Sequence, residues 1–189
     1  MAVASYLSSA LVVAAVSAVM ILRGRREPAV RYGLSYGLVL AALLAPLQVL
    51  IGDLHGLNVK QHQPIKVAAM EALWQTTRGA PFVVFAWPDM KAETNRYAIE
   101  IPRATSLILT HDPDGEVVGL RAVPPQDRPN VPIVFFGFRL MIGLGVVMLT
   151  VSWFGSWLLW CGTLIERRGF LRVLALSGPS GLIAVLAGW

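Results

Sequence analysis

A lysine and a glutamate in a polar stretch between apolar segments are the first candidates for chemistry. Lys66 and Glu71 lie in the stretch 52–74, which reads GDLHGLNVKQHQPIKVAAMEALW. Pro64 suits the first turn of a helix, and the residues from there to about Thr77 are mostly good helix formers. At 100° per residue the two side chains point about 140° apart. They therefore form no i,i+4 ion pair, but they could flank one groove from two sides.

The neighbours of Glu71 are unusual for a carboxylate. On a helix it shares a face with Val67 and Trp74, at i−4 and i+3. A carboxylate in such a partly apolar site can have a raised pKa and can serve as a proton acceptor. The alternative is an amphipathic helix on a membrane surface with an ordinary surface lysine and glutamate, and the spacing alone favours that alternative.

The composition is that of a membrane protein. Of the 189 residues 56% are hydrophobic and only 14% are charged, whereas soluble domains carry about 25% charged residues. The single cysteine, Cys161, excludes an intramolecular disulfide and a cysteine-based metal cluster within the chain. We expect it to be a buried small apolar residue. The spacing of His55, His62 and His111 matches no zinc pattern, and the net charge of +5 does not by itself indicate nucleic acid as a partner.

Four apolar stretches predict four transmembrane helices; three are near the roughly 20 residues that cross a bilayer, and the third in chain order is longer than the hydrocarbon core requires. They are residues 2–22, 32–51, 131–165 and 173–189. We expect an all-α membrane protein with a polar region between the second and third helices. Inside that region, residues 106–110 and 116–120 flank the sequence HDPDG and predict a β-hairpin.

The distribution of arginine predicts the orientation. The connections 23–31 and 166–172 carry four and three arginines, against one glutamate each. The positive-inside rule places both connections in the cytoplasm. The N-terminus and the polar region then lie outside. The expected organisation is two transmembrane helices in 1–52, an extracytoplasmic region in 53–130 and two transmembrane helices in 131–189.

The polar region carries a longer pattern that resembles a known family. KVAAMEALW is preceded by GD and followed by PFVVFAWPD and ETNRYAIEIP. Together these segments resemble the quinol-binding loop of subunit I of the cytochrome bd-type quinol oxidases, in the short-loop, cyanide-insensitive-type branch. The resemblance implies that Lys66 and Glu71 bind quinol and contribute to its oxidation, and it reverses the preference for a surface helix.

Further along, FFGFRLMIGLG resembles the FxFRxM segment of the same family. That likeness implies Met141 as an axial ligand of a low-spin haem b and Arg139 as a support for the haem's charged groups. Trp189, in IAVLAGW, would match a tryptophan near the high-spin haems. Without the resemblance, Arg139 would be a snorkelling residue and Met141 a packing residue.

The resemblance implies a terminal oxidase of the bacterial cytoplasmic membrane that oxidises ubiquinol or menaquinol and reduces oxygen to water. The complete subunit would also hold a high-spin haem b and haem d, and would work with oxidase subunit II in membrane lipid.

No apolar stretch here contains the histidine that the family uses opposite the methionine. When this sequence is aligned with the family's pattern, that histidine would immediately precede Met1. The family's GRQPW motif would follow Trp189. We therefore expect an internal fragment, incomplete and inactive alone. The rival is a non-enzymatic four-helix membrane protein whose outer domain binds a ligand or partner.

Overall fold

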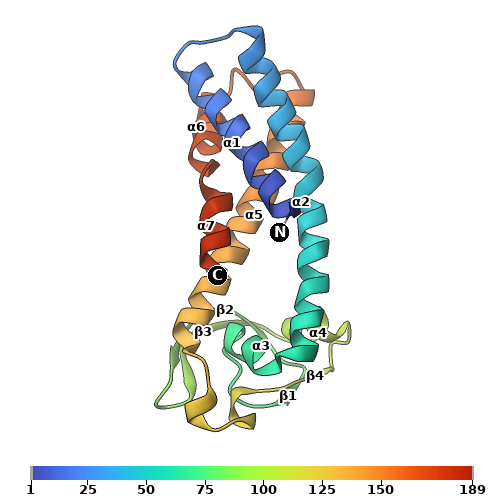
Figure 1. The fold of residues 1–189 in the computed structure, drawn as a ribbon, viewed down its shortest axis with the longest axis vertical. Helices are drawn as coiled ribbons and strands as arrows, with labels where there is room; N and C mark the ends of the chain where they lie inside the picture. Colours follow the sequence, from blue (N-terminus) through green and yellow to red (C-terminus); the bar gives the residue numbers. More distant parts are fainter. Residues whose placement is uncertain (1, 189) are drawn as a thin grey trace. The chain divides into compact units, whose positions relative to one another are not determined.

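The computed structural model describes residues 2–188, which fall into two compact units (Figure 1). One unit combines the chain up to Leu50 with the chain from Leu140 onward, and the other is Ile51–Arg139. Helices α2 (Pro28–His62) and α5 (Val131–Trp160) each cross a boundary without interruption.

The first unit contains the transmembrane helices that the sequence predicts. In the described chain, four helical segments are long and apolar enough to cross a membrane: Ala2–Leu22, Pro28–His62, Pro125–Trp160 and Arg168–Ala187. The first is helix α1 (Ala2–Leu22), whose bounds equal those predicted. Long apolar helices satisfy their own backbone polar groups, which is what a bilayer requires.

The last span is interrupted, although the sequence predicts one continuous apolar run. It consists of α6 (Arg168–Ser177) and α7 (Ser180–Ala187), which Figure 1 draws as separate helices. Pro179 stands at the break; proline lacks the N–H that would continue the ladder of helix α6. Cys161 follows the last residue of α5 and is exposed, so the expectation that it is buried is wrong.

Small residues bring the helices of this unit close together. A Cβ added to Gly37 of α2 would lie 2.6 Å from the carbonyl oxygen of Ala10 in α1. Leu11, Leu34 and Leu38 are fully buried beside this contact. Such close approach is typical of membrane helices, whose association depends on van der Waals packing.

The second unit begins with the end of α2, which continues eleven residues beyond the predicted end at Ile51 and includes His55 and His62. Helix α3 (Pro64–Met70) follows. It ends well before Thr77, because Ala72 has a φ of +51°, outside the right-handed helical region. The predicted start at Pro64 is confirmed, and the predicted end is wrong.

The same unit contains β-structure, so the chain is mostly helical rather than all-α. Strand β2 (Phe82–Asp89) pairs antiparallel with β3 (Thr94–Ile101). Strand β1 (Thr77–Arg78) pairs with β4 (Glu116–Val117). The 3₁₀ helices η1 and η2 cover Leu120–Ala122 and Pro125–Asp127.

The hairpin predicted around HDPDG is absent from the described structure. Residues Ala104–Thr110 form helix α4, and β4 pairs with the distant β1. The turn chemistry of the motif is real, because the Asp112 carboxylate accepts a hydrogen bond from the backbone N–H of Asp114 at 2.9 Å. The segment before the turn is nevertheless helical.

The turn after α3 is held in place by Asn95 of β3. The side-chain amide of Asn95 donates to the carbonyl of Ala72 at 2.9 Å and accepts from the indole N–H of Trp74 at 2.9 Å. Both hydrogen-bonding ends of the amide are therefore used. This brace fixes the left-handed residue directly after Glu71.

Candidate functional site

Glu71 is a buried carboxylate in the second unit. It directly follows the last residue of α3, and only 5% of its surface is exposed. Its Oε2 accepts hydrogen bonds from Nη2 of Arg139 at 2.7 Å and from Oγ1 of Thr105 at 3.3 Å. Three segments, the end of α3, helix α4 and the start of α5, therefore meet at one carboxylate oxygen.

Arg139 is held by the strand and by aromatic rings as well as by Glu71. Its Nε donates to the carbonyl of Val83 in β2 at 2.6 Å. The guanidinium carbon lies 4.3 Å from the ring centre of Phe82 and 4.7 Å from that of Phe135. Only 11% of the side chain is exposed. The cation is thus fixed in a largely desolvated position, where cation–π contacts are strongest.

Burial controls the protonation of Glu71. Desolvation raises the pKa of its carboxyl group above the ordinary value, and the charge of Arg139 and the hydrogen bonds from Arg139 and Thr105 lower it. The effect of burial is the larger, so the net direction is upward. A carboxylate with this balance accepts a proton more readily than a glutamate in water.

The ion pair leaves one acceptor and one donor unused. Both hydrogen bonds to Glu71 go to Oε2, so Oε1 accepts none within residues 2–188. Nη1 of Arg139 is buried and also has no partner among these residues. A buried donor without a partner is costly unless a ligand supplies the acceptor. A hydroxyl group both donates and accepts, so it has the chemistry to pair with an unused acceptor and an unused donor.

Lys66 lies apart from this network. Its side chain is exposed on α3 and makes no hydrogen bond or ion pair within the described chain; its backbone N–H donates to the carbonyl of Gln63 at 3.0 Å. The expectation that Lys66 and Glu71 form no pair with each other is confirmed, since Glu71 pairs with Arg139. That the two residues flank one ligand remains a prediction.

The sequence did not indicate Thr105 or the carbonyl of Val83 as parts of the site. Neither residue type suggests chemistry by itself, and both lie far along the chain from Glu71. The prediction that Arg139 supports a haem remains a prediction. In the structure its described contacts are with Glu71, Val83 and phenylalanine rings.

Met141 lies two residues after Arg139 in α5 and belongs to the first unit. It is partly buried against an apolar cluster that includes Leu11 and Met148. A Cβ added to Gly188 would lie 3.0 Å from its sulfur. A thioether in apolar surroundings is a soft donor that fits one axial position of a haem iron.

The described residues of the first unit, 2–50 and 140–188, include no histidine that could oppose Met141. His55, His62 and His111 all lie in the second unit. Within residues 2–188 no group of three or more histidine, cysteine, aspartate or glutamate side chains could hold a metal ion. Trp189 lies outside the described residues.

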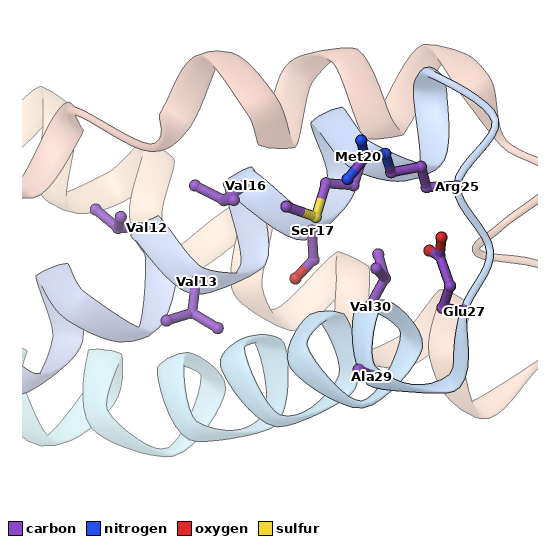
Figure 2. Close-up of a pocket in the computed structure, with 9 residues that line it drawn as sticks. All are labelled: Val12, Val13, Val16, Ser17, Met20, Arg25, Glu27, Ala29 and Val30. Carbon is purple, nitrogen blue, oxygen red and sulfur yellow. The ribbon is translucent and has the colours of Figure 1, made fainter.

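The first unit also contains an apolar groove of about 550 Å³ between α1 and α2 (Figure 2). Arg25 and Glu27 lie at one end of the groove, and Val12 and Val13 lie towards the other. None of the candidate residues lines it, so the groove is not the predicted site.

Comparisons with known proteins agree on one family. The family model described as cytochrome bd terminal oxidase subunit I matches residues 1–189. The chain is 27% identical to the cytochrome bd-II ubiquinol oxidase subunit 1 of Escherichia coli, over 98% of this chain and 49% of the relative. It is 29% identical to a putative cytochrome bd menaquinol oxidase subunit I of Bacillus subtilis, over 98% of this chain and 43% of that relative.

A solved structure supports the same relationship. The bd oxidase from Geobacillus thermodenitrificans matches 99% of this chain with a TM-score of 0.87 and 30% sequence identity. The match covers 43% of the solved chain, and the present chain spans less than half the length of these curated relatives. The matches do not favour the rival of a non-enzymatic membrane protein.

Proposed function

This chain belongs to the family of cytochrome bd terminal oxidase subunit I, and from that premise we propose that it forms the quinol-oxidising part of such a subunit. The complete protein would pass electrons from quinol to a site where oxygen is reduced to water. The observation that carries the proposal is the buried pair of Glu71 and Arg139, with one free acceptor and one free donor. A quinol presents a hydroxyl group that matches both.

In this proposal Glu71 is the proton acceptor. The quinol hydroxyl donates to Oε1 of Glu71 and accepts from Nη1 of Arg139. Oxidation of a quinol to a quinone releases two protons and two electrons: one proton goes to Glu71, the other goes to water, and the electrons would pass one at a time to the haem b held by this subunit. The exposed ammonium group of Lys66 is free to bind the substrate from the solvent side.

Met141 is proposed to hold a low-spin haem b through its sulfur. A haem bound there would accept single electrons, and a methionine ligand raises the reduction potential of a haem. Arg139, two residues earlier, carries the positive charge closest in sequence to this ligand. The complete protein is proposed to bind a high-spin haem b and haem d as well, and to work with oxidase subunit II. Its substrate would be ubiquinol or menaquinol. Its location would be the bacterial cytoplasmic membrane, in contact with lipid along the four spans.

The function can be tested at Lys66 in the complete subunit in bacterial membranes. Lys66→Ala should raise KM for quinol by about tenfold, the effect of losing one charge-assisted contact of about 1.4 kcal/mol. The measurement is quinol-driven oxygen consumption. Lys91→Ala removes another exposed lysine of the same unit and should leave KM unchanged. Oxygen consumption that does not depend on added quinol would refute the function altogether.

The orientation gives a second prediction. Because both arginine-rich connections are expected in the cytoplasm, a cysteine at Asp114 should react with a membrane-impermeant thiol reagent in intact cells. A cysteine at Glu27 should not. The background should carry Cys161→Ser, since Cys161 is exposed and would add labelling of its own. The reverse labelling pattern would place the second unit in the cytoplasm and contradict the proposal.

The pKa of Glu71 gives a third prediction. Thr105→Val removes a hydrogen bond that lowers this pKa, so the pKa should rise further. Glu71 must be ionised to accept a proton, and a higher pKa leaves less of it ionised at a given pH. The acid limb of kcat/KM against pH should therefore move to higher pH. Thr94→Val, at the exposed start of β3, is the matched control. An acid limb that stays in place or moves to lower pH would separate Glu71 from the proton transfer.

A further inference from the structure

We infer that one face of the β2–β3 hairpin binds the isoprenoid tail of the quinol. The inference rests on the proposed function and extends it from the quinol head group to the rest of the substrate. Its basis is an exposed apolar strip that begins at the Glu71–Arg139 pair.

The strand register gathers apolar side chains on one face. Phe82 is paired with Ile101, and Phe85 is paired with Ile99. Paired residues of antiparallel strands point to the same side of a sheet. Phe85, Ile99 and Ile101 are 47%, 61% and 51% exposed. The hairpin therefore exposes a strip of large apolar side chains, a feature that marks interaction sites on folded domains.

One end of the strip touches the polar pair. The ring of Phe82 stacks on the guanidinium of Arg139 at 4.3 Å, and the next residue of the strand, Val83, accepts a hydrogen bond from the same side chain. Ile99 precedes Ile101 by two residues on the same face of β3, so at about 3.3 Å per residue the pair of Phe85 and Ile99 lies about 7 Å further along the strands. A ligand with its hydroxyl at Arg139 can therefore lay an apolar chain along this face.

Further along the hairpin, two aromatic side chains contact the first turns of α5. Phe85 and Trp87 both contact Phe136, with ring centres 6.3 Å and 5.6 Å apart. Phe136 belongs to the first turns of α5 and precedes Leu140 by four residues. The strip therefore lies in the same unit as the Glu71–Arg139 pair and is bordered by a further aromatic ring, so an apolar chain attached to a polar head group finds both surfaces within one unit.

The apolar strip together with the neighbouring polar pair fits a quinol with its tail better than it fits other apolar ligands. A bulk lipid surface or a protein partner would need only the apolar residues. The free acceptor and donor at one end of the strip add a requirement for a hydroxyl group that is attached to an apolar chain. A quinol with its tail meets both requirements with one molecule.

The test compares two substrates in the complete oxidase in bacterial membranes. One is tetramethylhydroquinone, which has no tail, and the other is a quinol with an isoprenoid tail. Ile99→Asn places a polar group in the middle of the strip at an exposed position, so the fold should tolerate it. We expect KM for the tailed quinol to rise roughly fivefold to tenfold, with kcat and the KM for tetramethylhydroquinone unchanged.

Matched variants separate the tail surface from a general loss of structure. Ile99→Leu keeps an apolar side chain and should restore the wild-type KM. Leu107→Asn makes the same kind of change at another exposed position of the unit, on α4, and should affect neither substrate. The haem spectrum of each variant checks that the protein is assembled.

The outcomes that overturn the inference are distinct. An unchanged KM for both substrates would mean that the strip faces solvent, bulk lipid or a protein partner. An equal rise for both would mean that the hairpin supports the head-group site and not the tail. The proposed function has a separate test. If the Glu71→Gln variant oxidised quinol at the wild-type rate, the proposed function would fail, whatever the result at Ile99.

Discussion

Replacing Glu71 with glutamine is expected to lower kcat/KM for quinol oxidation by about 10²-fold or more, the usual contribution of a positioned proton acceptor. Glutamine keeps the size of the side chain and can still accept hydrogen bonds from Arg139 and Thr105. It cannot take the proton that quinol releases. The measurement is quinol-driven oxygen consumption by the complete subunit, with the haem spectrum recorded on the same membranes.

Two controls make this result specific to the buried carboxylate. Glu100→Gln removes an exposed carboxylate of β3 and should leave the rate unchanged. Glu71→Asp keeps the charge opposite Arg139 and shortens the side chain by one methylene, so it should retain more activity than the glutamine variant. If the glutamine variant oxidises quinol at the wild-type rate, Glu71 is not the acceptor and the site is wrongly assigned.

The pairing of Glu71 with Arg139 also determines how much a substitution of either residue lowers the free energy of unfolding. Breaking a buried ion pair by removing one partner typically costs 3–5 kcal/mol, because the remaining charge stays desolvated. Here the remaining charge would be a guanidinium enclosed by Phe82 and Phe135. Glutamine also leaves this charge without a countercharge, but it keeps an oxygen that accepts the hydrogen bonds of Arg139 and Thr105, so it disturbs the site less than a truncation to alanine.

The membrane helices could be predicted from the sequence, because their signal is local. A run of about 20 apolar residues has few alternatives to a transmembrane helix, and the bounds of α1 agree with the prediction to the residue. The break at Pro179 lies inside such a run, and proline was the visible reason for it.

The second unit was harder to predict because its contacts join distant parts of the chain. Strand β1 pairs with β4 almost forty residues later, so the local turn signal of HDPDG suggested the wrong partner. The end of α3 depends on Ala72, whose left-handed conformation is braced by Asn95. No local pattern indicates such a brace.

The site was predictable in part. Glu71 stood out because apolar residues surround it in the sequence, and the structure buries it. Its partner Arg139 is 68 residues away, and spacing along one helix cannot reveal a contact of that kind. The structure thus adds the ion pair, and with it the free donor and acceptor that carry the proposal.

Replacing Met141 with leucine is expected to abolish the low-spin haem b signal of the complete subunit without unfolding the helices around it. Leucine nearly conserves the volume, so the packing against Leu11 and the space beside Gly188 should be kept at a cost below about 1.5 kcal/mol. The substitution removes the sulfur, which is the only atom of this side chain that can bind iron. The measurement is a reduced-minus-oxidised difference spectrum of purified membranes.

Met148→Leu is the matched control for this experiment, because the same helix and the same apolar cluster supply a second methionine. Met148 is 7% exposed and lies two turns further along α5. Its replacement makes the same chemical change with the same packing cost, so it should leave the low-spin signal in place. Loss of the signal in both variants would indicate a packing effect, and its survival in Met141→Leu would show that another residue binds the iron. Only loss at Met141 with retention at Met148 agrees with an axial thioether at the position two residues after Arg139.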